Sequence, residues 1–438
     1  MSNIDVVVLT LAIVLVVGVV TFLFSEKTHI SYVPILIVLG LAVGPALHII
    51  QRSVAHQLFE YARVFGLVII LFAEGHNLKW ALLKKHFATI GLLDTVGLMA
   101  TTVIAGLAFM LLFHVPFVVG FLFGAIIGAT DPATLIPLFK QHNIDEDVRS
   151  VIVTESIFND PLGIVMTVLA VALLVPQAPS AQFIERIAHF TTLYPAAVIF
   201  FLYEIGMSLA IGVALGMIGY WLIRVLHLEN FAEIYSLALA FGGFALGEAA
   251  GASGYLVATI IGMVLGNHEV FFKRHIPLAR HPKHVIQREL HFNEIVSSLA
   301  TVIIFILLGA SIDLAVLKSA LLLGTVVALI VVFVARPVAG LTILPLRKWT
   351  LRQYLFMSFE GPRGIVPSAL ADLLLGLGLT YKNSQLVSWG ESILAVTVVT
   401  ILVSVLIETL WTGVLNDRLL KIPRRRPAAA DSQPAVVH

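Results

Sequence analysis

Long apolar stretches dominate this sequence and constrain what it can fold into. Thirteen stretches approach the roughly 20 apolar residues that a helix needs to cross a bilayer. They cover residues 4–24, 30–50, 57–77, 87–113, 116–139, 150–175, 193–224, 231–249, 253–267, 291–310, 315–341, 351–376 and 389–415. Only 12% of the residues are charged, about half the roughly 25% of soluble domains. We therefore expect an all-α polytopic membrane protein in the lipid bilayer, and the composition argues against a soluble enzyme or a nucleic-acid-binding protein.

The basic residues predict the orientation of these spans. An odd number of helices places the two termini on opposite sides, and cytoplasmic loops carry the excess of Lys and Arg. With the C-terminus inside, 20 of the 27 Lys and Arg residues lie on the cytoplasmic side, 4 lie outside and 3 lie within spans. We therefore expect a cell-membrane protein with its N-terminus outside and its C-terminus in the cytoplasm.

Interrupted helices in the fifth and twelfth spans suggest an internal repeat. Such breaks at corresponding places in two halves are typical of transporter binding sites, and an offset of seven spans inverts the second half. The predicted parts are two inverted six-helix repeats, a connecting helix and a basic, disordered cytoplasmic tail. They cover residues 1–175, 231–420, 176–230 and 421–438, in that order.

The first break is predicted at Thr130-Asp131-Pro132. Pro132 lacks a backbone N–H and clashes with the preceding turn, and non-helical backbone inside a membrane requires protein or a water-filled cavity around it. Asp131 at this break either belongs to an ion site or serves only as an N-cap of a kinked helix.

A polar stripe follows in the sixth span, where Glu155, Ser156, Asn159 and Asp160 lie on one helical face. Oxygen-rich clusters suit hard cations, and a buried carboxylate holds a proton more tightly than one in water. One such group can therefore exchange a proton for a cation. The alternative is a hydrogen-bonded packing cluster.

Arg336 is the one charged residue in the apolar run 324–344, so it requires a carboxylate partner unless it reaches the membrane surface. Glu155 is the first choice and Asp131 the second. Because Arg stays charged, its partner would also stay ionised. This reasoning makes Glu155 structural and Asp160 the carrier.

The second break is predicted at Gly361-Pro362. Glu360 and Arg363 flank it, either as a local ion pair or as part of a transport pathway. Glu74, at the end of the third span, is either an ion ligand or a boundary carboxylate in water.

Four sequence blocks together resemble the cation:proton antiporter family 1, with the best match to NhaP-type sodium/proton antiporters. The blocks are Thr130-Asp131-Pro132, ESIFNDP at 155–161, HFNEIVSSLATVIIFILLGA at 291–310, and Gly361-Pro362-Arg363-Gly364. They occur in the order and at the spacing of the family, and the resemblance extends to about residue 415.

The resemblance implies an NhaA/NhaP-like fold of thirteen helices with crossed broken helices, in a homodimer. A core of spans 4–6 and 11–13 would move against a dimerisation domain of spans 1–3 and 7–10. Asn159 stands where electrogenic relatives carry a second Asp, which implies electroneutral exchange, and Glu155 with Arg336 matches a buried ion pair. The residues implied to bind Na⁺ or exchange the proton are Asp160, Asp131, Thr130, Ser156, Asn159 and Glu74.

The function expected on these grounds is secondary-active sodium (or lithium)/proton antiport, in which Na⁺ and H⁺ compete for Asp160. The sequence has no P-loop for ATP-driven transport, and we expect neither a cofactor nor an enzymatic activity. Potassium/proton antiport on the same scaffold and, less favoured, a cation channel are the alternatives.

Overall fold

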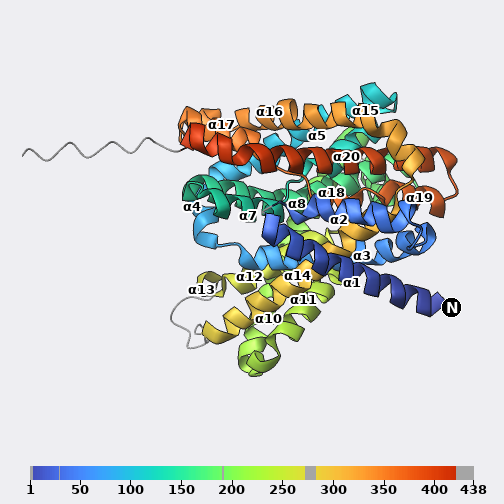
Figure 1. Ribbon diagram of the computed structural model, residues 1–438. Coiled ribbons are helices and arrows are strands. Elements are labelled where there is room, and N and C mark those ends of the chain that lie inside the picture. Colours follow the sequence, from blue (N-terminus) through green and yellow to red (C-terminus); the bar gives the residue numbers. More distant parts are fainter. Residues whose placement is uncertain (1–2, 29, 190–191, 272–282, 421–438) are drawn as a thin grey trace, which may run out of the picture.

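The computed structural model describes residues 3–28, 30–189, 192–271 and 283–420, and every element in these ranges is helical. The helices run roughly side by side in Figure 1. The tail 421–438, predicted to be disordered, lies outside the described residues.

One group of helices packs around α3 (Arg52–Asn77), which lies between α12 (Gly254–Gly266) and α14 (Lys283–Ser311) and contacts both extensively. This group occupies the lower part of Figure 1. Its other members are α1 (Asn3–Thr28), α2 (Tyr32–Leu41), η1 (Ala42–Ala46), α10 (Leu193–Val225), η3 (Leu228–Phe231), α11 (Ala232–Ala249) and α13 (His268–Phe271).

A second group packs around α8 (Glu146–Leu174) and α20 (Ser384–Leu415), and α18 (Ile365–Leu370) lies where the groups meet, in contact with α3, α8 and α14. The remaining members are α4 (Trp80–Leu92), η2 (Leu93–Gly97), α5 (Leu98–Phe113), α6 (Phe117–Gly128), α7 (Pro132–His142), α15 (Leu314–Ile330), η5 (Val331–Ala335), α16 (Arg336–Leu341), η6 (Leu344–Leu346), α17 (Leu351–Phe359), α19 (Leu373–Thr380) and η7 (Asn416–Leu420). The group around α3 contains predicted spans 1–3 and 7–10. The group around α8 and α20 contains predicted spans 4–6 and 11–13.

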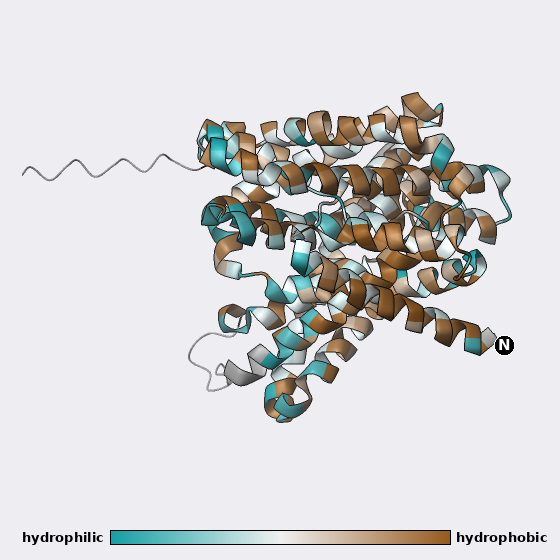
Figure 2. Cartoon of the chain, viewed as in Figure 1, coloured by the Kyte–Doolittle hydropathy of each residue, from teal (hydrophilic) through white to brown (hydrophobic). Residues whose placement is uncertain are grey.

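The surface has the character of a protein embedded in lipid. Hydrophobic residues predominate along the lengths of the helices, whereas hydrophilic residues gather towards the helix ends on the left and right of Figure 2. Large apolar residues such as Val16, Leu322 and Leu410 are more than half exposed. A water-soluble fold would bury such residues, so this exposure places them against lipid tails.

Each of the thirteen predicted stretches falls on one helix or on consecutive helices. Within the described ranges, seven helices are long and apolar enough to cross a membrane, and the bent pair α6 and α7 makes an eighth. The count of thirteen spans and the inverted repeat therefore remain predictions.

Two details differ from expectation. Helix α9 (Pro179–Ala188) was not predicted, because ten residues with mixed polar and apolar side chains are too short to span a bilayer. The segment 268–290, which lies between two predicted spans, contains α13, and α14 already begins at Lys283. The first two turns of α14 are rich in polar residues, so they do not form part of an apolar run.

Candidate functional site

Two broken helices meet in the interior of the protein. Extended residues separate α6 from α7 and α17 from α18, at the positions predicted from Pro132 and Gly361-Pro362. The Asp131 N–H donates to the Pro362 carbonyl over 2.9 Å. A Cβ on Gly364 would overlap the Asp131 side chain, so this glycine permits the close approach of the two breaks.

Asp131 caps the second half of its broken helix. Its carboxylate accepts the N–H groups of Ala133 at 3.3 Å and Thr134 at 3.1 Å, and also the Thr134 hydroxyl. A carboxylate is stabilised at this end because the first N–H groups of a helix are unpaired and carry partial positive charge. Asp131 therefore has the geometry of an N-cap residue, as in the second alternative. Both of its carboxylate oxygens already accept hydrogen bonds from the start of α7.

Arg363 binds the C-terminal end of α6, the first half of the same broken helix. Its Nη1 donates to the carbonyls of Gly128 at 2.6 Å and Ala129 at 3.1 Å, where α6 terminates. A cation is favourable at the negative C-terminal end of a helix. Glu360 instead accepts the Thr412 hydroxyl. The alternative of a local ion pair between Glu360 and Arg363 is therefore wrong. Arg363 binds the end of α6, and Glu360 contacts Thr412 on α20.

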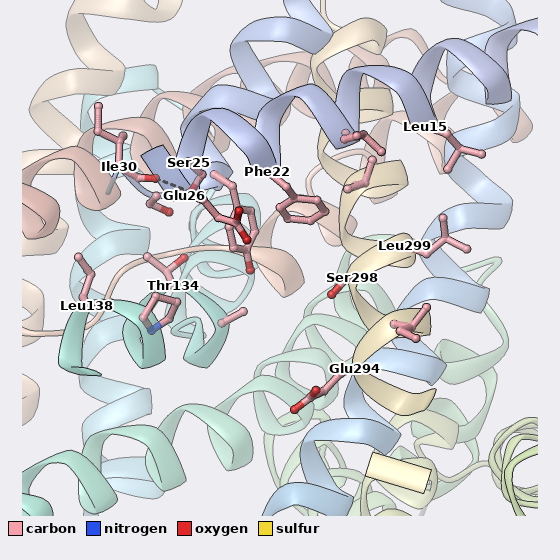
Figure 3. Close-up of a pocket in the computed structure, with 18 of the residues that line it drawn as sticks. Leu15, Phe22, Ser25, Glu26, Ile30, Thr134, Leu138, Glu294, Ser298 and Leu299 are labelled. Atoms are coloured by element: carbon pink, nitrogen blue, oxygen red, sulfur yellow. Dashed lines mark hydrogen bonds between the residues drawn. The ribbon is translucent and has the colours of Figure 1, made fainter. Parts of the chain in front are cut away.

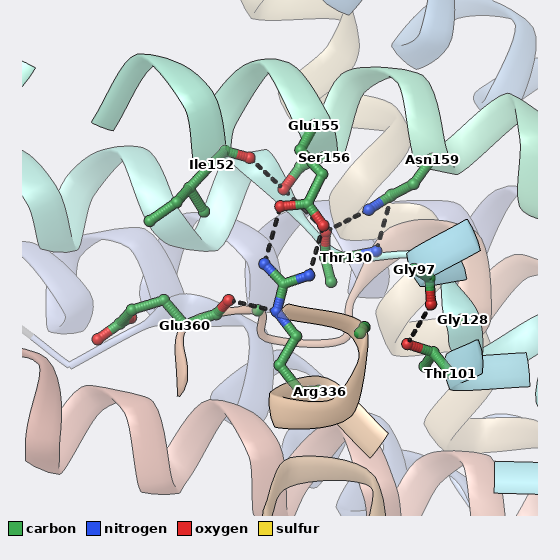
Figure 4. A network of polar contacts seen from close by, with 12 residues as sticks. Gly97, Thr101, Gly128, Thr130, Ile152, Glu155, Ser156, Asn159, Arg336 and Glu360 are labelled. Carbon is green, nitrogen blue, oxygen red and sulfur yellow. Dashed lines mark hydrogen bonds and ion pairs between the residues drawn. The ribbon is translucent and has the colours of Figure 1, made fainter. Parts of the chain in front are cut away.

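The polar stripe of α8 reaches the first break through a chain of hydrogen bonds (Figure 4). The Thr130 N–H donates to Asn159 Oδ1 at 3.0 Å, and Asn159 Nδ2 donates to Thr130 Oγ1 at 2.7 Å. The hydroxyls of Thr130 and Ser156 are 2.8 Å apart, and Ser156 Oγ donates to the Ile152 carbonyl. Because Ser156 gives its proton to Ile152, Thr130 donates to Ser156. Asn159 thus holds Thr130 through both backbone and side chain.

Asp160 belongs to the same stripe but takes no part in this chain of bonds. The residue is only 2% exposed, and its Oδ1 is buried without a hydrogen-bond partner. The charges of Glu74, Asp131 and Arg363 act on it. Glu74 is partly buried, and its Oε2 lacks both solvent and a partner, so this carboxylate is not simply a boundary group in water. Buried carboxylate oxygens without partners are costly, and a bound cation or proton would satisfy them.

Glu155 and Arg336 form a buried ion pair beside this site. Arg336 Nη1 and Nη2 donate to the two carboxylate oxygens, the latter at 2.8 Å, and Nε donates to the Glu360 carbonyl at 2.8 Å. The Arg336 side chain is 7% exposed and the Glu155 side chain is 2% exposed. The guanidinium thus joins α8 to the second break, and it does not reach the membrane surface.

Two residues of this region were missed from the sequence. The Thr134 hydroxyl binds Asp131, and Glu408 on α20 accepts the Gly361 N–H at 3.0 Å. A threonine three residues after an N-cap Asp is a local signal for the first. Glu408 stands within the apolar run of the thirteenth predicted span, and its cost in lipid is the signal that pointed to the other buried acids.

A cavity of about 770 Å³ extends from α1 and α14 towards the first break. Figure 3 shows Phe22, Ser25 and Glu26 of α1, Glu294 and Ser298 of α14, and Thr134 of α7 around this space. Because Thr134 lines this cavity and also contacts Asp131, one side chain separates the cavity from the Asp131 carboxylate at the break.

The acidic groups alone do not make a metal site. In the part of the chain that the structure describes, no three Asp, Glu or His side chains converge closely enough to hold a metal ion. A cation at Asp160 would therefore also need hydroxyl, carbonyl or water oxygens, which are suitable ligands for hard cations.

Comparisons with known proteins agree with this architecture. Residues 11–417 match the family model described as sodium/hydrogen exchanger, transmembrane. The chain is 34% identical to Na(+)/H(+) antiporter 1 of Methanocaldococcus jannaschii over 94% of its own length and 95% of that protein. It is 30% identical to the K(+)/H(+) antiporter NhaP2 of Shewanella oneidensis over 72% of its own length, but spans only 51% of that protein.

A solved structure shares the fold. The sodium proton antiporter MjNhaP1 from Methanocaldococcus jannaschii at pH 8 superposes with a TM-score of 0.84 and 31% sequence identity, covering 95% of this chain and 99% of that one. The match spans both helix groups and both broken helices. This multi-pass membrane protein therefore belongs to the sodium/hydrogen exchanger family.

Proposed function

We propose that this protein is a secondary-active sodium/proton antiporter in which Asp160 binds either a cation or a proton. The observation that carries the proposal is the buried Asp160 carboxylate, which has an oxygen without a hydrogen-bond partner and is acted on by charges at both of the adjoining helix breaks. Sodium as the cation is supported by the Methanocaldococcus relatives, which are named Na(+)/H(+) antiporters and align along nearly their whole length. Lithium would be accepted as a smaller ion of the same charge.

Mutually exclusive occupancy gives exchange. Protonation of Asp160 removes the charge that attracts the cation, and a bound cation removes the charge that holds the proton. Either ligand neutralises a site that is otherwise a buried charge, so the loaded site moves across the membrane and the empty, charged site does not. Alternating access of the loaded states then couples the two ion flows without ATP.

The neighbouring residues have separate parts in this proposal. Thr130 and Ser156 would supply hydroxyl or carbonyl oxygens to the cation, and Asn159 would hold Thr130 in place. Asp131 and Glu74 would add negative charge, although Asp131 is largely engaged by the N-terminus of α7. Glu155 is paired with Arg336 and would not carry the exchanged ion. The cavity ending at Thr134 would admit the ions, with Arg363 and Glu360 supporting the breaks beside the pathway.

We further propose that exchange is electroneutral, because a neutral Asn159 leaves Asp160 as the single exchanging carboxylate of the stripe. The protein would be a homodimer in the cell membrane with its N-terminus outside, its C-terminus in the cytoplasm and two inverted six-helix repeats around the connecting helix.

The test is sodium-driven proton flux in proteoliposomes. Asp160→Asn should abolish it, because an amide has neither a negative charge to bind the cation nor a proton that ionises near neutral pH. Glu146→Gln, at the exposed start of the same helix, is the matched control and should retain it. Normal sodium-driven flux in Asp160→Asn would refute the assignment of the carrier.

A second assay separates the alternatives. Flux driven by sodium, lithium and potassium gradients should rank potassium last, and a clear preference for potassium would favour the activity for which the Shewanella relative is named. Clamping the membrane voltage with a potassium ionophore, in the sodium and lithium arms, should leave exchange rates unchanged. A voltage-driven, non-saturating current would instead indicate a channel.

A further inference from the structure

A second pair of buried acids lies at the Gly361-Pro362 break, outside the exchange site. Glu360 is the last residue before the break and is 0% exposed, and Glu408 on α20 is 1% exposed. Neither residue takes part in the exchange at Asp160 proposed above as cation ligand or proton carrier.

Crossed hydrogen bonds bring the two carboxyl groups together. Glu408 Oε1 accepts the N–H of Gly361, the residue after Glu360, over 3.0 Å. In return, Glu360 Oε2 lies 3.0 Å from the hydroxyl of Thr412, one helical turn after Glu408, and this hydroxyl also bonds to the Glu408 backbone carbonyl over 2.7 Å. Each carboxyl therefore contacts the element that carries the other, and the charge of Glu408 acts on Glu360.

Each carboxyl keeps one oxygen without a partner. Glu360 Oε1 and Glu408 Oε2 are both buried and make no hydrogen bond. Two acceptor oxygens of this kind cannot satisfy each other, because ionised carboxylates only accept hydrogen bonds. A single proton supplies the missing donor, since a protonated carboxyl donates to its ionised neighbour.

Neither of the two nearby cations forms an ion pair with these acids in the described part of the chain. Arg336 is matched by both oxygens of Glu155, and it touches Glu360 only through the backbone carbonyl. Arg363 directs Nη1 to the carbonyls that end α6, and its Nε is buried without a hydrogen-bond partner. In Figure 4 the Glu360 side chain points away from the guanidinium of Arg336. The charges that act on the acids besides each other are those of Arg336, Arg363 and Asp131, so no carboxylate–guanidinium pair neutralises them.

We propose that Glu360 and Glu408 form a proton-binding site that holds one shared proton, which is separate from the proton exchanged at Asp160. Closely spaced buried carboxyls cannot both ionise cheaply, and sharing one proton is the usual solution. The shared proton ties α20 to the second broken helix and keeps the interior at this break close to neutral.

Infrared spectroscopy of the full-length protein in lipid at neutral pH counts such protons, because a protonated carboxyl has a carbonyl stretch that a carboxylate lacks. The wild type in saturating sodium should retain a protonated-acid band from this pair, whereas a band from Asp160 should disappear when sodium is added. Sodium sensitivity thus separates a failure of this proposal from a failure of the exchange proposal.

Three variants identify the band. Glu408→Gln keeps the oxygen that accepts from Gly361 and places an NH₂ towards Glu360, so it imitates the protonated acid. Glu408→Gln, Glu360→Gln and the double variant should each lose the same single band, because one proton serves two carboxyls. Glu391→Gln, on the same helix but partly exposed, is the control and should keep the band.

The remaining outcomes overturn the proposal. A band unaffected by either single variant would show that the acids carry no proton, and a double variant that loses twice the intensity would show two protons rather than one. If Glu408→Gln does not fold, Glu360→Gln alone tests whether the acids carry a proton, and its amide bands show that this variant is folded. Sodium-driven exchange in Glu408→Gln should remain close to that of the wild type, and its loss would mean that this proton belongs to the transport cycle.

Discussion

The ion pair of Glu155 and Arg336 allows a quantitative prediction about stability. We consider Glu155→Leu, Arg336→Met and the double variant. The side chains are 7% exposed or less, and the guanidinium donates to both carboxylate oxygens and to the Glu360 carbonyl. Removing one partner of a buried pair leaves an uncompensated charge and costs about 3–5 kcal/mol.

The double variant should be far more stable than the two single effects together suggest. Replacing both members of a buried pair by apolar residues is often neutral, and the remaining loss is the bond to the Glu360 carbonyl, about 1–3 kcal/mol. At about 2 °C per kcal/mol, the lower value for large domains, each single variant should unfold about 6–10 °C below the wild type. The double variant should unfold only about 2–6 °C below it.

The assay is thermal unfolding of the purified protein in detergent, followed by tryptophan fluorescence and analysed as a double-mutant cycle. Two results would refute the reasoning. Single losses of about 1 kcal/mol or less would be those of a solvent-exposed pair, and additive losses would show that the two charges do not compensate each other. Sodium/proton exchange should persist in the stable double variant, because Glu155 is not the proposed carrier.

Three further predictions concern the site and its access. Asn159→Asp should slow exchange and lower the unfolding temperature, because an ionised carboxylate cannot donate to Thr130 Oγ1 as Asn159 Nδ2 does; unchanged rates and unfolding temperature would contradict this. Gly364→Ala should impair both exchange and stability, since its Cβ would overlap Asp131, whereas Gly242→Ala, at a position with open space, should be harmless; equal behaviour of the two variants would refute the close approach of the breaks. Ser298→Cys, in the cavity, should react with a water-soluble thiol reagent and lose exchange activity, whereas Ser53→Cys, at the exposed start of α3 and outside the predicted spans, should react without loss. The chain has no native Cys to interfere, and retained exchange in fully labelled Ser298→Cys would exclude this cavity as the entry route.

Much of the helical structure was predictable from the sequence, for local reasons. Apolar runs, separated by short polar segments, mark the helices, and Pro132 and Pro362 mark both breaks because proline cannot continue the backbone hydrogen bonds. The scarcity of charge also pointed to the important groups, since an Arg or Glu inside an apolar run must find a partner. Helix α9 and the first turns of α14 escaped detection because their mixed composition carries no signal of an apolar span.

The assignment of partners could not be predicted in the same way. Asp131 and Asp160 are both acids within predicted spans, yet the N-terminus of α7 engages the first, whereas the second keeps an oxygen without a hydrogen bond. Glu360 and Arg363 flank the same break but bind different helices. Glu408 carried the signal of an acid inside an apolar run, but its partner Gly361 lies 47 positions away and could not be identified from the sequence.

The sequence by itself therefore determined that this chain is a helical membrane protein with two interrupted helices and a small set of buried acids. These properties depend on composition and on backbone chemistry within a few residues. Only the tertiary structure decided which acid is paired, which caps a helix and which has an oxygen left for an ion. Those outcomes depend on how helices distant in sequence pack against each other, as at the hydrogen bond from Asp131 to Pro362, and side-chain hydrogen bonds form or fail within a few tenths of an ångström.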